Sequence, residues 1–116
     1  MSVKRGFKTV YAVDFDGTLC ESVWPGIGRP NEELIAHLIK KRKKGCLVIL
    51  WTCREGERLQ EAVEWCCAHG LEFDAVNDNC KQEIERFGTN SRKIHYDVLI
   101  DDKSLAKGKY GVPFGR

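Results

Sequence analysis

The chain has 116 residues, of which 42% are apolar and 31% charged, with a net charge of +2. This composition is typical of a globular domain and excludes an intrinsically disordered chain. The small net charge gives no reason to require a nucleic-acid partner, although it does not exclude one. No apolar run approaches the roughly 20 residues of a membrane span. We therefore expect one domain over residues 1–116 and no membrane contact.

The first eight residues are polar and basic and contain no apolar signal segment, which predicts a cytoplasmic protein. Six cysteines are present without a CxxC pair, so a zinc ribbon is not expected. In a reducing compartment these thiols are predicted to be free and mostly buried.

Apolar runs alternate with segments of helical periodicity along the chain. A loop is expected over 19–30, because two prolines and two glycines interrupt any regular pattern there. The expected elements are, in chain order, a strand over 9–13, a helix capped by Asn31 and stopped by Gly45, a strand over 46–51, a helix over 57–69 stopped by Gly70, a strand over 73–76, a helical turn over 82–87, a strand over 96–100 and a short last strand over 110–113.

Continuously apolar strands between amphipathic helices predict an α/β fold, a doubly wound three-layer sandwich around a central, mostly parallel sheet. Three expected strands run directly into polar residues, namely Asp14, Thr52 and Asp101. The carboxyl ends of parallel strands meet at one edge of the sheet, where ligands bind. Residues far apart in the sequence should therefore converge on one site.

The chemistry of this edge is that of carboxylates and a hydroxyl. Four acids (Asp14, Asp16, Asp101 and Asp102) are expected beside Thr52. Clustered carboxylates repel one another unless a cation neutralises them, and ligands that are all oxygen favour magnesium over zinc. A carboxylate nucleophile, a metal and a phosphate-binding hydroxyl together indicate phosphoryl transfer.

These residues resemble the motifs of a known family. The run Asp14-Phe15-Asp16-Gly17-Thr18 resembles motif I of the haloacid dehalogenase superfamily, Thr52 its motif II, and Asp101-Asp102 its motif IV. Nearly the whole chain is similar to small phosphatases of this superfamily that lack a cap domain, through residues 50–56 and 100–103. The resemblance implies a Rossmann-like core and magnesium-dependent hydrolysis of phosphomonoesters.

The resemblance also implies roles for the two acids of motif I and for Asp101. Asp14 would attack phosphorus, form an aspartyl-phosphate and bind Mg²⁺. Asp16 would act as general acid and then as general base, with its backbone carbonyl on the metal. Asp101 would complete the magnesium shell, with Asp102 beside it.

Phosphate binding is implied for three further positions. Gly17 would let the backbone pass close to the phosphate, while Thr52 and the amide of Cys53 would hold phosphate oxygens. The superfamily also uses a lysine, for which Lys93 fits the small-phosphatase pattern better than Lys81; a solvated surface charge is the alternative for both.

Three other polar side chains are candidates for this edge. Arg54 is expected to touch the substrate, to pair with an acid at the edge, or to remain a surface charge. Asn77 and Asn79 follow the third strand and either line the site or serve as turn residues. The basic run 40–44 falls in the last turn of a helix, where a solvated face is expected rather than a nucleic-acid contact.

The segments 19–30 and 77–95 are too short to hold a cap domain, so an open site is expected. Such a site accepts a bulky phosphorylated substrate or takes a wall from a neighbouring subunit, and Trp24 with residues 25–29 is the expected local lid. Two alternatives stay open: a receiver-like phospho-acceptor domain and a phosphate-ligand binding protein without catalysis. Motif order disfavours the receiver, since its phosphorylated aspartate follows the third strand, and retention of Asp16 disfavours the binding protein.

Overall fold

The computed structural model describes residues 8–88 and 94–101. Six strands and three helices lie in this part of the chain, with these bounds in chain order: β1 (Val10–Val13), β2 (Cys20–Val23), β3 (Gly26–Pro30), α1 (Glu32–Lys43), β4 (Leu47–Leu50), α2 (Gly56–Ala68), β5 (Ala75–Val76), α3 (Lys81–Phe87) and β6 (Val98–Ile100). The strand expected over 110–113 lies outside the described residues.

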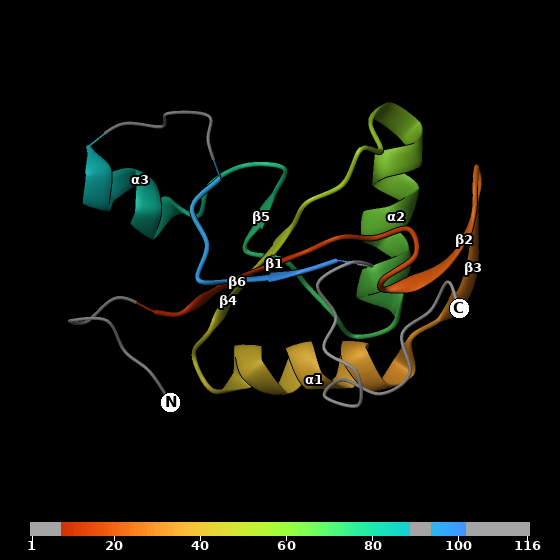
Figure 1. Cartoon of the computed structure of the whole chain (residues 1–116), viewed down its shortest axis with the longest axis horizontal. Coiled ribbons are helices and arrows are strands. Elements are labelled where there is room, and N and C mark those ends of the chain that lie inside the picture. Colours follow the sequence, from red (N-terminus) through yellow and green to blue (C-terminus); the bar gives the residue numbers. More distant parts are fainter. Residues whose placement is uncertain (1–7, 89–93, 102–116) are drawn as a thin grey trace.

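A four-stranded parallel sheet in the order β5-β4-β1-β6 forms the centre of this α/β fold (Figure 1). The apolar runs of the sequence become its strands, and β1 occupies an inner position between β4 and β6. All four strands therefore end at the same edge of the sheet. None of the helices in the described part of the chain has the length and apolar character needed to span a membrane.

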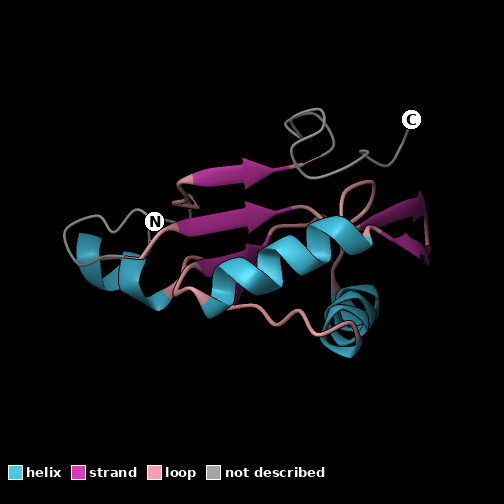
Figure 2. Cartoon of the chain, turned by 90° about the horizontal axis from the view of Figure 1, so that it is seen from below, coloured by secondary structure: helices cyan, strands magenta, loops and turns pink. Residues whose placement is uncertain are grey.

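Helix α1 lies across one face of the sheet (Figure 2), and α2 packs against the apolar cluster on the same side. Alternate strand residues, among them Val13 and Leu50, pack there against Leu34 and Leu38 of α1 and Cys66 of α2. The opposite face carries a smaller apolar cluster of Val10, Ala12, Ile49 and Cys80. The alternation of side chains along each strand thus decides which residues at the carboxyl edge point away from α1 and α2.

The expected helix boundaries are confirmed. The Oδ1 of buried Asn31 accepts a hydrogen bond from the backbone N–H of Leu34 at 3.3 Å, which caps α1. The Asn31 Nδ2 also donates to the carbonyl of Thr18 at 3.1 Å, so the cap fixes the start of α1 to the turn after β1. Gly45 and Gly70 follow α1 and α2 with φ of 98° and 89°, a conformation that glycine adopts without strain.

The prediction of a loop over 19–30 is wrong, because this segment forms an antiparallel hairpin of β2 and β3. The prolines and glycines mark its turn and a close approach of the two strands. A Cβ at Gly28 would lie 2.7 Å from the backbone oxygen of Glu21, so only glycine lets the strands pair there. An ion pair between Arg29 and Glu21 joins the strands across the same region.

Two aspartates fix the start of the outer strands by the same pair of hydrogen bonds, which we term the aspartate brackets. Before β5, the Asp74 N–H donates to the Val48 carbonyl, and the Asp74 carboxylate accepts from the Val48 N–H at 2.7 Å. Before β6, Asp97 makes the same two bonds with Val10, the second also at 2.7 Å. Each bracket sets the position of an outer strand at the amino edge of the sheet.

The Asp74 bracket yields a stability prediction. Substitution Asp74→Ala leaves the Val48 N–H without its acceptor and Arg42 without its hydrogen-bonded partner, so the free energy of unfolding should fall by about 1–3 kcal/mol. Urea denaturation of both proteins measures this. Glu72→Ala is the matched control, because Glu72 is exposed and reaches Arg42 only at 4.0 Å. Equal destabilisation by the two substitutions would contradict the role given to the bracket.

Candidate functional site

A tight turn follows β1 and carries the first two acids of the predicted site. The Asp14 N–H donates to the Ile100 carbonyl at 2.9 Å, which holds this residue between β1 and the end of β6. The chain then reverses, with the Leu19 N–H donating to the Phe15 carbonyl at 2.9 Å. Gly17 has a φ of 81° inside this turn and is buried, so a side chain there would strain the backbone.

The Asp16 carboxylate is held by Arg54, 38 residues further along the chain. Arg54 Nε donates to Asp16 Oδ2 and Arg54 Nη2 to Asp16 Oδ1, both at 2.8 Å. The Arg54 side chain is 1% exposed and that of Asp16 is 23% exposed. These hydrogen bonds hold the pKa of the Arg54 guanidinium above its usual value, although burial alone would lower it. Of the roles expected for Arg54, pairing with an acid is confirmed.

The same guanidinium holds the β2–β3 hairpin against the turn after β1. Arg54 Nη2 donates to the Gly26 carbonyl at 2.7 Å and Nη1 to the Pro25 carbonyl at 3.3 Å. Its Cζ lies 5.0 Å from the ring centre of Phe15 and 4.9 Å from that of Trp24. Arg54 thus holds the hairpin tip beside Asp16. This tip belongs to the segment of Trp24 and residues 25–29 for which the sequence predicts a lid.

A cavity of about 270 Å³ opens at the carboxyl edge of the sheet. Its walls come from the ends of β1, β4 and β6, and the lining residues are Asp14, Trp51, Thr52, Cys53, Leu99 and Asp101. Four of the predicted site residues are therefore brought together. Asp16 does not line this cavity, because its carboxylate is directed to Arg54.

Thr52 is oriented in this cavity by two neighbours. Its Oγ1 accepts from the Arg54 N–H at 3.2 Å, so the hydroxyl can donate its hydrogen to a ligand. The Thr52 N–H donates to Asn77 Oδ1 at 2.8 Å, and the Asn77 N–H donates to the Leu50 carbonyl at 2.7 Å. Asn77 has a φ of 52°, in the left-handed region that asparagine tolerates. Through these two hydrogen bonds, Asn77 fixes the backbone of Thr52 at the carboxyl end of β4.

The structure places two candidates away from this edge. Asn79 is buried, and its Oδ1 accepts from the His95 N–H at 2.7 Å, before β6 begins. Lys81 begins α3 and lies with Lys8 and Leu47 at the amino edge of the sheet, opposite the Asp14 cavity. Lys93 and Asp102 lie outside the described residues. Cys53 is exposed and lines the cavity, while the contact of its backbone amide with phosphate stays a prediction.

The carboxylates of the edge are divided between two neighbourhoods. Asp14 and Asp101 share the cavity, while Asp16 belongs to Arg54. Within residues 8–88 and 94–101, no group of three histidine, cysteine or acidic side chains is arranged to hold a metal ion. Two carboxylates on one cavity are therefore what the described chain offers to a cation.

Sequence reasoning missed two features of the site. Trp51 was expected to end a buried strand, but it is 43% exposed and lines the cavity. The hairpin contact of Arg54 was also missed. A continuous apolar run does not reveal where a strand leaves the core, and only the polar Thr52 after Trp51 signalled the edge.

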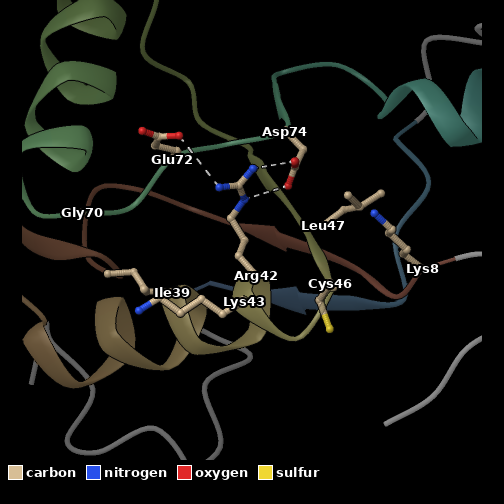
Figure 3. A pocket seen from close by; sticks show the side chains of 10 residues that line it. Lys8, Ile39, Arg42, Lys43, Cys46, Leu47, Gly70, Glu72 and Asp74 are labelled. Carbon is tan, nitrogen blue, oxygen red and sulfur yellow. Dashed lines mark hydrogen bonds and ion pairs between the residues drawn. The ribbon is translucent and has the colours of Figure 1, made fainter.

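A larger cavity, of about 350 Å³, lies near the amino edge of the sheet (Figure 3). Arg42 spans it toward Glu72 and donates to Asp74 Oδ1 at 2.8 Å, while Lys8 and Lys43 stand on its walls. The Asp74 hydrogen bonds raise the pKa of the Arg42 guanidinium. The charge of Arg42 is therefore neutralised by its own chain, and the described residues that line this cavity form no cluster of catalytic groups.

The fold and its edge define an α/β protein with an acidic cavity at the carboxyl ends of parallel strands. Neither a protein-family model nor a curated protein matches the chain. A solved structure of a conserved protein from Bacteroides thetaiotaomicron superposes with a TM-score of 0.74 and 39% sequence identity, over 89% of this chain and 84% of that one. The chain belongs to the same family as this bacterial protein.

The first prediction from the site concerns Arg54. Arg54→Met leaves Asp16 and two hairpin carbonyls without their donors and should lower the free energy of unfolding by about 3 kcal/mol. Arg58→Met is the matched control, since Arg58 is half-exposed, pairs only with Glu61 at 3.2 Å, and should change stability by no more than about 0.5 kcal/mol. Thermal and urea unfolding measure the stability of both variants. Equal losses of stability in the two variants would refute the stabilising role given to Arg54.

A second prediction concerns the thiols. Burial raises the pKa of Cys20 to about 11 and the pKa values of Cys66 and Cys80 to about 12. At pH 8 at most roughly one in a thousand of these groups is thiolate, the form that alkylates. Iodoacetamide should therefore label exposed Cys53 and Cys67 in the native protein. Mass spectrometry compares the neighbours Cys66 and Cys67 directly; equal labelling rates in the folded protein would contradict this, whereas both should react in urea.

Proposed function

We propose that this protein is a magnesium-dependent phosphomonoesterase of the haloacid dehalogenase type, with Asp14 as nucleophile. The observation that carries the proposal is the separation of the two motif I acids. Asp14 shares a cavity with Asp101 and Thr52, whereas Asp16 is held outside it by Arg54. In this proposal Asp14, on the cavity, meets phosphorus, and Asp16 serves the leaving group, as the resemblance of the sequence implies. The doubly wound, three-layer arrangement of that superfamily, without a cap domain, belongs to the same proposal.

The donor set fits magnesium. Asp14 and Asp101 supply two carboxylates on one cavity, and Mg²⁺ sites commonly use one or two carboxylates together with a substrate phosphate. The backbone carbonyl of Asp16 is the further protein ligand that the resemblance implies. When bound, the ion would neutralise the charge of the phosphate and of the carboxylates that approach it.

The first step is the attack of the Asp14 carboxylate on phosphorus. A bond forms between an Asp14 oxygen and phosphorus while the ester bond between phosphorus and oxygen breaks, which gives an aspartyl-phosphate and an alcohol. The Asp14 Oδ1 already accepts from the Phe15 N–H at 2.7 Å, so the carboxylate is held in orientation. The Thr52 hydroxyl donates to a phosphoryl oxygen.

Asp16 moves the protons. It gives a proton to the departing ester oxygen, and then takes one from the water that attacks phosphorus and releases inorganic phosphate from Asp14. Arg54 Nε and Nη2 occupy one acceptor site on each Asp16 oxygen, and each oxygen retains a second site for the transferred proton. Arg54 is therefore a positioning residue for Asp16.

The alternatives fit the described chain less well. In a receiver the phosphorylated aspartate follows the third strand, but here β5 is followed by Asn77, whose amide oxygen binds the Thr52 N–H. Retention of both Asp14 and Asp16 favours turnover over a binding protein without catalysis, since the resemblance gives Asp16 a role only in turnover. The site edge also bears no basic cluster in the described residues, so nucleic acid is not part of the proposal.

The experiment is the hydrolysis of p-nitrophenyl phosphate by the full chain. Activity should require Mg²⁺, disappear with EDTA, return with excess Mg²⁺, and fall on the order of a thousandfold or more in Asp14→Asn. Glu64→Gln is the matched control, because it makes the same change of carboxylate to amide on the exposed side of α2. Activity that survives EDTA or Asp14→Asn would refute the mechanism.

A further inference from the structure

Trp51 is an exposed aromatic residue that directly follows three buried residues of β4. Leu50 has no exposed surface, yet the next residue is 43% exposed and lines the cavity of Asp14. The Trp51 N–H donates to the Val13 carbonyl at 2.8 Å, so its backbone is fixed beside the residue that precedes Asp14. The backbone that carries the indole is therefore fixed at the carboxyl edge of the sheet.

The alternation of the strands puts this ring on the same side of the sheet as the acids. Val13, Leu50 and Ile100 point into the core under α1 and α2. The residue after each of them points the other way, and these three residues, Asp14, Trp51 and Asp101, all line the cavity. Leu99 faces the same side and packs with the apolar cluster of the second sheet face.

The cavity thus has two chemical halves. The polar half consists of Asp14, Asp101 and Thr52, which the proposed phosphoryl chemistry uses, and exposed Cys53 beside them. The apolar half consists of the Trp51 indole and Leu99. Among the described lining residues, no further hydroxyl, amide or charged side chain is left for the hydroxyl groups of a sugar or polyol. A site without such partners favours a flat apolar group over a polar one.

We propose that the substrates of this site are phosphomonoesters that carry a planar aromatic ring next to the ester oxygen, with the ring stacked on Trp51. This inference rests on the proposed function and specifies its substrate class. Stacking of an aromatic ring on an indole gives a free energy beyond that of burying the apolar surface of the ring. Removal of one such contact is expected to lower affinity or rate about tenfold.

Two other exposed aromatic residues of the described chain do not offer the same contact. Trp24 is exposed, but its ring lies 4.9 Å from the Arg54 Cζ and it does not line the cavity. Tyr96 is also exposed and stands before β6, at the amino edge of the sheet. Tyr96 therefore provides a control for the loss of an exposed aromatic side chain away from the cavity.

The test compares benzyl phosphate with cyclohexylmethyl phosphate in the presence of Mg²⁺. The two leaving alcohols are of similar size and acidity and differ in the flatness of the ring. For the unchanged protein, kcat/KM should favour benzyl phosphate about tenfold. Trp51→Leu should reduce this preference to about one. Trp51→Phe should keep most of the preference, and Tyr96→Ala all of it.

Binding of benzylphosphonate and cyclohexylmethylphosphonate, measured by calorimetry with Mg²⁺, separates this inference from the proposed function. Tighter binding of the benzyl compound that Trp51→Leu abolishes supports the inference even if neither ester is hydrolysed, a result that would refute the phosphatase. Hydrolysis of both esters at equal rates, or a preference unchanged in Trp51→Leu, would overturn the aromatic substrate class and leave the phosphatase intact. Circular dichroism and thermal unfolding verify that each Trp51 variant is folded.

Discussion

The buried charge of Arg54 is the constraint around which the carboxyl edge of this protein is arranged. A guanidinium with a 1% exposed side chain is stable only if its donors and its charge are satisfied by the protein. The partners come from the turn after β1, through Asp16, and from the hairpin tip, through the carbonyls of Pro25 and Gly26. Three segments that are distant in the sequence therefore form one unit, and the hairpin has its place because the arginine needs its carbonyls.

The same constraint decides how the carboxylates are distributed. Several carboxylates in one cavity would repel one another and would bind protons instead of remaining charged. Arg54 withdraws Asp16 from that group, so Asp14 and Asp101 are the carboxylates of the described chain that line the cavity. Two carboxylates repel each other less than three would, and one divalent cation balances their two negative charges. The separation of Asp14 from Asp16 thus has an electrostatic origin in Arg54, 38 residues further along the chain than Asp16.

Local signals predicted much of the fold, and non-local contacts account for what they missed. Asn31 and the glycines after α1 and α2 act within one helical turn, so their effects could be predicted from neighbouring residues. The hairpin could not, because prolines and glycines also mark loops, and its contact with Arg54 joins positions nearly 30 residues apart. The convergence of Asp14, Thr52 and Asp101 was predicted because parallel strands share one edge. The choice of Lys93 over Lys81 rested on the resemblance to the small-phosphatase pattern, and the structure places Lys81 at the opposite edge.

The aspartate brackets have a consequence at the far end of the sheet. They lie at the amino edge, yet they set which residue of each outer strand stands opposite which residue of its neighbour. A slip of β6 by a single residue would exchange its two faces, turning Asp101 into the core and Ile100 into the cavity. The brackets thus protect the chemistry of the opposite edge against misregistration. A substitution at Asp97 would therefore displace Asp101 from the cavity by a shift of β6, although Asp97 itself lies at the opposite edge of the sheet.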